Sequence, residues 1–158
     1  MTKLFTACEV IDVAVELERM GAEFYSQVAL FAQDDERRKI FEGLAECERQ
    51  HEQRFRELYQ VLKQCAPDTP ESYPGEWQSY VHALITSRTI LGKEEVERIA
   101  KYGSAEEIAK LAIQLEKDSI LLYETLLNYV PEGERSKVEQ LLTDEREHLS
   151  CVLNLMHG

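Results

Sequence analysis

The chain has 158 residues, the usual length of one domain, and 44% of them are hydrophobic, too many for a disordered acidic segment. Its 30 acidic and 18 basic residues give a formal net charge of −12, so we expect no binding to nucleic acid or to an anionic membrane surface. No apolar run is long enough to span a membrane, and residues 1–10 lack the apolar core of a signal peptide, so we expect one cytoplasmic domain over residues 1–158.

A first hairpin of helices is predicted over residues 6–65. Thr6 followed by Glu9 forms a capping box, a pattern typical of a helix start, and the helix continues to about residue 33. Asp34 and Asp35 then place negative charge where the amino end of a second helix favours it. This second helix is expected to end near residue 64.

A connector is predicted over residues 66–103. Three prolines and a glycine interrupt the helical pattern directly after the first hairpin. Two short helices are predicted within the connector, at about residues 77–88 and 93–102.

A second hairpin is predicted over residues 104–156. Ser104 and Glu107 form another capping box, which begins the third long helix, and Pro131 with Gly133 separates that helix from the fourth. The predicted fold class is therefore all-α, an antiparallel four-helix bundle with a long helical connection between the two hairpins.

Acidic residues interrupt the apolar stripes of three of these helices. At three- and four-residue steps, the stripe of the second helix contains Glu48 and His51, and that of the fourth contains Glu145 and His148. Glu116 interrupts the third stripe in the same way. A buried, ionised carboxylate without a partner costs several kcal/mol, so these residues are not explained by stability.

The two hairpins repeat one polar pattern. In each half, a Glu is followed by Tyr seven residues later, and a Glu-x-x-His motif follows about 30 residues after the first Glu. The matched pairs are Glu18 with Glu116, Tyr25 with Tyr123, Glu48 with Glu145, and His51 with His148. A lone Glu-x-x-His is more often a solvated ion pair, but two at equivalent places of a repeat favour a buried site. Duplicated hairpins also pack naturally around a pseudo-two-fold axis.

The repeated residues have the chemistry of a two-metal site. Residues three apart share a helix face, so each Glu-x-x-His can hold one centre, and Glu18 and Glu116 add one carboxylate each. Four carboxylates would be neutralised by two divalent cations. Oxygen-rich ligation with one imidazole per ion suits iron, or manganese, better than zinc or copper. We therefore predict two iron ions per chain, with manganese as the alternative.

At these residues the chain resembles the rubrerythrin branch of the ferritin-like di-iron superfamily, over nearly all of both hairpins. The resemblance implies that Glu18 and Glu116 are terminal carboxylates. It implies that the bridging carboxylates, which carry the catalytic role, are Glu48 and Glu145, and that the imidazole ligands are His51 and His148.

The resemblance also implies residues that support the ligands. Tyr25 and Tyr123 are similar to the tyrosines that hydrogen-bond across such sites, although core aromatics would follow the same pattern. Asp144 stands where such proteins place an acid that fixes the tautomer of a ligand histidine, here His51. The equivalent position in the first half is Cys47.

The chain departs from the related families at several positions. Ser119 replaces a further Glu of rubrerythrin, and Arg49 replaces the haem-ligating Met of bacterioferritin, so no haem is expected. The four cysteines form no Cys-x-x-Cys pair, so we expect no rubredoxin domain and interpret the cysteines as reduced thiols on helix faces. The ten residues after His148 leave no room for the fifth helix of ferritin cages.

The function expected from these features is an oxidoreductase of oxidative-stress defence. It would reduce hydrogen peroxide or dioxygen with electrons from a separate donor, such as a rubredoxin-like protein. The alternatives are a ferroxidase or iron-storage protein, and a non-catalytic metal-binding bundle. The resemblance further implies a homodimer.

Overall fold

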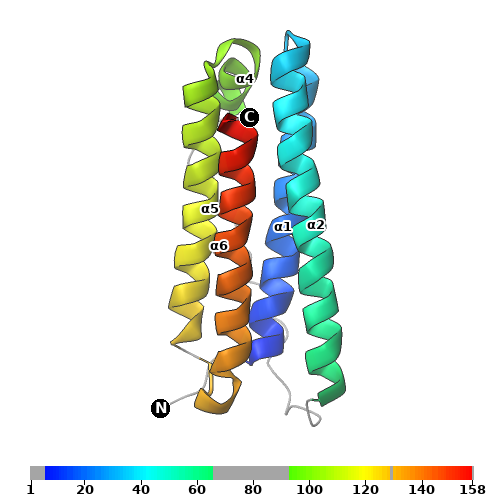
Figure 1. The fold of residues 1–158 in the computed structure, drawn as a ribbon, viewed down its shortest axis with the longest axis vertical. Coiled ribbons are helices and arrows are strands. Elements are labelled where there is room, and N and C mark those ends of the chain that lie inside the picture. Colours follow the sequence, from blue (N-terminus) through cyan, green and yellow to red (C-terminus); the bar gives the residue numbers. More distant parts are fainter. Residues whose placement is uncertain (1–5, 66–92, 129, 158) are drawn as a thin grey trace.

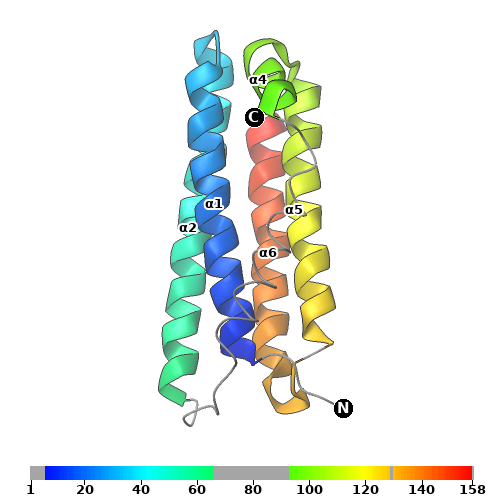
Figure 2. The same cartoon turned by 180° about the vertical axis from the view of Figure 1, so that it is seen from behind.

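The computed structural model describes residues 6–65, 93–128 and 130–157, and these residues form helices without any strand. The four long helices are α1 (Ala7–Phe31), α2 (Asp35–Cys65), α5 (Ala105–Leu127) and α6 (Arg135–His157). In Figures 1 and 2, α1 lies beside α2 and α5 beside α6, and the two helices of each pair run in opposite directions, whereas α2 and α5 run in the same direction. The predicted all-α, antiparallel four-helix bundle is confirmed.

The helix starts follow the predicted capping chemistry. In α1, the Thr6 hydroxyl accepts from the Glu9 amide and the Glu9 carboxylate accepts from the Thr6 amide. Ser104 and Glu107 form the same reciprocal pair at the start of α5. Asp34 accepts from the Arg37 amide at 2.8 Å, so it caps the first turn of α2. Local sequence therefore determines where three of the four long helices begin.

The connector is described only at its end. The predicted helix at 93–102 is confirmed as α4 (Lys93–Tyr102), which lies at the end of the bundle where α5 begins (Figure 1). The helix predicted at 77–88 lies outside the described residues. A short 3-10 helix, η1 (Glu132–Glu134), precedes α6, so the fourth helix begins at Arg135.

Two apolar clusters form the core, one towards each end of the bundle. One cluster contains Leu17, Phe55 and Leu141, and the other contains Phe41 and Val152. Along each long helix, the polar residues of the repeated pattern lie between residues of these two clusters. The apolar clusters thus stabilise the bundle above and below a polar layer.

Cys47 departs from the expectation for the cysteines. Its side chain is buried in α2 and is disulfide-bonded, so the interpretation as a reduced thiol is wrong for this residue. Disulfides are unusual in the cytosol, and the cytoplasmic location stays a prediction. None of the described helices is long and apolar enough to cross a membrane.

Candidate metal centre

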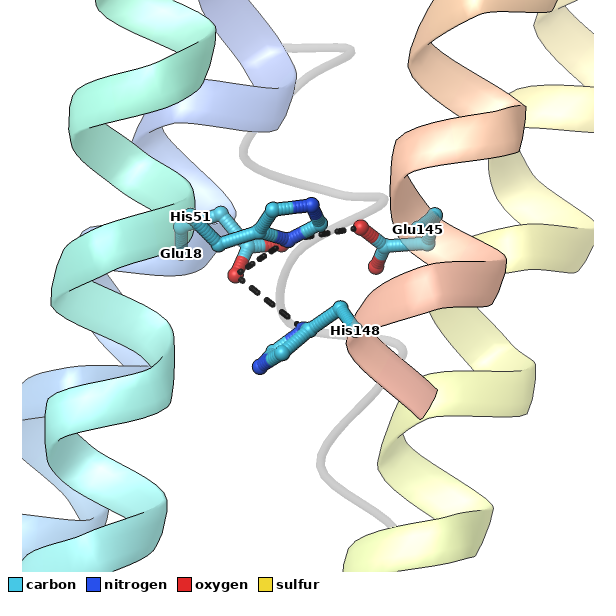
Figure 3. A group of neighbouring side chains, drawn as sticks. All are labelled: Glu18, His51, Glu145 and His148. Atoms are coloured by element: carbon cyan, nitrogen blue, oxygen red, sulfur yellow. Dashed lines mark ion pairs between the residues drawn. The ribbon is translucent and has the colours of Figure 1, made fainter. Parts of the chain in front are cut away.

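All six residues predicted as metal ligands are buried in the polar layer between the two apolar clusters. Each long helix contributes to them: α1 provides Glu18, α2 provides Glu48 and His51, α5 provides Glu116, and α6 provides Glu145 and His148. Figure 3 shows four of these side chains pointing towards one another from α1, α2 and α6. The structure therefore brings the predicted set together.

The antiparallel arrangement of α2 and α6 pairs their motifs head to tail. His51 Nδ1 lies 3.1 Å from Glu145 Oε2, and His148 Nε2 lies 4.0 Å from Glu48 Oε1. Within each motif the two residues are three positions apart and face the same side of their helix. Each imidazole consequently meets the carboxylate of the opposite motif, as a pseudo-two-fold relation between the hairpins requires.

The carboxylates of α1 and α5 close the layer from the other two sides. Glu18 Oε2 lies 3.4 Å from His51 Nδ1 and 3.8 Å from His148 Nδ1 (Figure 3). Glu116 Oε2 lies 3.1 Å from His148 Nδ1. These distances leave nitrogen and oxygen donors facing a shared interior space.

The donors fall into two groups that could each hold a cation. One group contains Glu18, His51, Glu145 and His148, and the other contains Glu48, Glu116 and His148. In each group, one ligand atom per residue lies within 4.8 Å of the others. Carboxylate oxygens with imidazole nitrogens are donors suited to iron or manganese.

Buried polar atoms without hydrogen bonds support a cation-binding role. Within the described part of the chain, the ring nitrogens of His51 and His148 and the carboxylate oxygens of Glu145 form no hydrogen bond, although some of them lie within ion-pair distance of one another and Glu145 is 0% exposed. Leaving such atoms unsatisfied costs free energy, and buried polar groups in proteins are otherwise nearly always paired. Metal coordination would satisfy them, so the residues present fit a two-metal centre.

The buried carboxylates of the layer lie close together, and their like charges repel one another. Burial raises the pKa of Glu48 well above the usual 4.5, and the charges of Glu18 and Glu116 raise it further. Burial also raises the pKa of Glu145, against the opposing effect of His51. Without cations, the layer therefore favours retention of protons on its carboxyl groups.

His148 is shifted towards its protonated form. Burial lowers its pKa, but the contact with Glu116 and the charge of Glu48 outweigh this effect, so the pKa lies above its usual value. A proton on this imidazole compensates part of the negative charge that divalent cations would otherwise neutralise.

Asp144 has different partners from those predicted. Its Oδ1 accepts from Arg54 at 2.8 Å and from Gln140 at 3.1 Å, while the ring nitrogens of His51 form no hydrogen bond with any described residue. The expected bond from Asp144 to His51 is therefore not formed in the described structure. Arg54 is a residue that the sequence reasoning missed, although its position three residues after His51 places it on the same side of α2.

The two tyrosines are buried at opposite sides of the polar layer. Tyr25 is 1% exposed and belongs to one apolar cluster, and Tyr123 is 0% exposed and belongs to the other. Their positions follow the pseudo-two-fold relation. Hydrogen bonds from their hydroxyls across the site stay a prediction.

Comparison with known families gives one match. A family model described as Rubrerythrin matches residues 9–156, nearly the whole chain and all six clustered donors. No curated protein and no solved structure matches the chain.

Proposed function

The chain belongs to the rubrerythrin family, and from this premise we propose that it is a di-iron carboxylate enzyme that reduces hydrogen peroxide or dioxygen. The observation that carries the proposal is the layer of four buried carboxylates and two buried histidines supplied by all four long helices. Such a layer is expensive to bury and lies in the centre of the bundle, where it has no role in surface charge. We propose that electrons arrive from a separate protein, such as a rubredoxin-like donor.

The six clustered residues would hold the ions, and each has a distinct part. Glu48 and Glu145 would bridge the two ions, while Glu18 with His51 and Glu116 with His148 would complete the two ligand sets. When bound, two Fe(II) ions supply the two electrons that, with two protons, convert hydrogen peroxide into two waters. The carboxyl groups that favour their protonated forms without cations would release protons as the ions bind.

Iron retention after gel filtration is the first test. Chain exposed to Fe(II) is expected to keep about two irons, and Glu48→Ala is expected to lose this capacity. The matched control is Glu42→Ala, because Glu42 lies exposed on the same helix. No retained iron in the wild-type chain would contradict the proposal.

Oxidation kinetics separate an enzyme from the alternatives. Fe(II)-loaded chain is mixed without air with peroxide or with dioxygen, and oxidation is followed by absorbance. Oxidation faster than that of free Fe(II) supports the proposed reaction, and the faster oxidant identifies the substrate. Many irons per chain would indicate storage, whereas binding with no acceleration would indicate a non-catalytic metal-binding bundle.

Assembly and location form a further part of the proposal. We propose a homodimer on the basis of the family resemblance, and a cytoplasmic location on the basis of composition and charge. Light scattering coupled to gel filtration gives the mass directly. A cage-sized mass would favour the storage alternative.

A further inference from the structure

Gly21 lies in the interior of α1, three residues after Glu18, and faces the polar layer. A Cβ atom built at this position would lie 2.8 Å from Glu48 Oε2 and 2.9 Å from Glu48 Cδ. Real Cβ atoms almost never come so close to another heavy atom. The carboxylate of Glu48 therefore occupies the volume that any other residue at position 21 would need.

Glycine is an unfavourable choice at this point of the chain. It weakens a helix interior relative to alanine, because it loses more backbone freedom on folding. Its φ is not in the left-handed region, so backbone conformation does not require it. The close approach of the Glu48 carboxylate is the physical reason that remains.

We propose that Gly21 is a positioning residue for Glu48, whose missing side chain lets this carboxylate lie against α1 and face the metal centre. The inference rests on the proposed two-metal function. Glu48 is only 6% exposed, and its carboxylate has Glu18, Glu116 and His148 as charged or titratable neighbours. A methyl group at position 21 would push the carboxylate away from α1 and towards these groups.

The effect is expected on metal binding rather than on folding. The atoms in the way are the far end of a flexible side chain, not backbone, so the protein can accommodate the methyl group by moving the carboxylate. Moving it changes the ligand geometry, and metal affinity is sensitive to small displacements of ligands and of the residues that orient them.

The second hairpin has a side chain at the position equivalent to Gly21. The equivalent position, three residues after Glu116, is the buried Ser119, whose hydroxyl donates to the Leu115 carbonyl at 3.2 Å. A side chain is accommodated there. Position 21 thus holds a glycine against Glu48, whereas position 119 holds a buried serine.

Cobalt titration of the full chain tests the inference without any activity measurement. Co(II) absorption bands report both the number of bound ions and their ligand geometry. Gly21→Ala is expected to bind at least one ion about tenfold more weakly or with altered bands. Gly133→Ala is the matched control, because a Cβ there meets nothing within 4 Å, and it should bind like the wild-type chain. Affinity and bands of Gly21→Ala equal to those of the wild type would overturn the inference.

A double variant links the effect to Glu48. In the double variant Gly21→Ala/Glu48→Asp, the side chain at position 48 is one methylene shorter and leaves room for the methyl group. Gly21→Ala should therefore lower cobalt affinity much less in the Glu48→Asp background than in the wild-type chain. If Gly21→Ala does not fold, circular dichroism of the double variant should show recovery, and no recovery would overturn the inference. A wild-type chain that binds no cobalt would instead overturn the two-metal function, and the inference with it.

Discussion

At the scale of single residues, the polar layer contains more carboxylates than positively charged groups that could compensate them. Glu48 and Glu145 have raised pKa values because burial disfavours their charged forms, and His148 has a raised pKa because neighbouring carboxylates overcome its burial. Protonation is how the metal-free protein limits the repulsion. The same groups must change their protonation when cations enter.

These shifts predict how the stability of the metal-free chain depends on pH. A carboxyl group whose pKa is raised by folding makes its full contribution to stability below about pH 4.5, the usual pKa of Glu. This contribution is lost as the pH rises through the pKa of the folded state. The raised pKa of His148 likewise lowers stability as the pH rises above 6.5, the usual pKa of histidine. The free energy of unfolding should therefore fall as the pH rises above about 4.5 in the presence of a chelator, and His148 should add to the fall above about 6.5.

Urea unfolding at several pH values checks this prediction. Glu48→Gln should show a shallower decline, because an uncharged amide cannot ionise at that position. Glu42→Gln, on the exposed side of the same helix, should behave like the parent chain. Metal-free stability that rises over this pH range would contradict the electrostatic account.

At the scale of elements, the ends of the helices determine how the ligands are placed along the bundle axis. The capping box of Thr6 and Glu9 begins α1, and the Ala7 amide donates to Glu134 Oε2 at 2.8 Å, which joins this end of α1 to the turn before α6. The Arg54–Asp144 pair joins α2 to α6 close to the polar layer. A slide of α2 or α6 by one turn would separate the two Glu-x-x-His motifs, which now face each other.

The α1 cap gives a prediction at this scale. Thr6→Ala removes the acceptor of the Glu9 amide and should lower the free energy of unfolding by about 1 kcal/mol. Thr143→Ala is the control, because the Thr143 hydroxyl bonds only within its own exposed helix turn. Denaturant unfolding measures both variants, and equal stability of Thr6→Ala and the parent would show that the cap contributes nothing.

At the scale of the whole molecule, two apolar clusters enclose a layer that is unfavourable until it binds cations. Ions that bind the folded chain and not the unfolded one stabilise it through mass action. A divalent ion at about 100 times its dissociation constant should raise the melting temperature by about 5–10 °C, because the stabilisation is about 2.7 kcal/mol per site.

Scanning calorimetry with zinc or manganese checks this linkage. A chelator should return the melting temperature to the metal-free value, and His148→Ala should reduce the shift, since His148 belongs to both donor groups. Redox-inert zinc is expected to stabilise the chain as other divalent ions do. No shift at saturating metal would show that the layer does not bind cations in the folded state.

Several parts of the site followed from the sequence because they depend on local spacing. Each capping box spans four consecutive residues, and both form as predicted. Helical periodicity alone places the Glu and the His of each Glu-x-x-His motif on one helix face. The repeat between the hairpins implied that these two faces meet. The prediction for Asp144 was wrong about its partner because Arg54, one turn after His51 on α2, reaches the Asp144 carboxylate, and the position of a long side chain is not a local property.

By itself, the sequence determined the all-helical class, the ends of most long helices and the six residues that gather in the polar layer. These follow from periodicity, capping and repetition, which act over a few residues or between two similar hairpins. Only the tertiary structure decided that Asp144 pairs with Arg54 and that Cys47 is disulfide-bonded. It also decided that Glu48 fills the space beside Gly21. The physical reason is that the Arg54–Asp144 and Gly21–Glu48 contacts join residues far apart in the chain, and their distances depend on how whole helices pack.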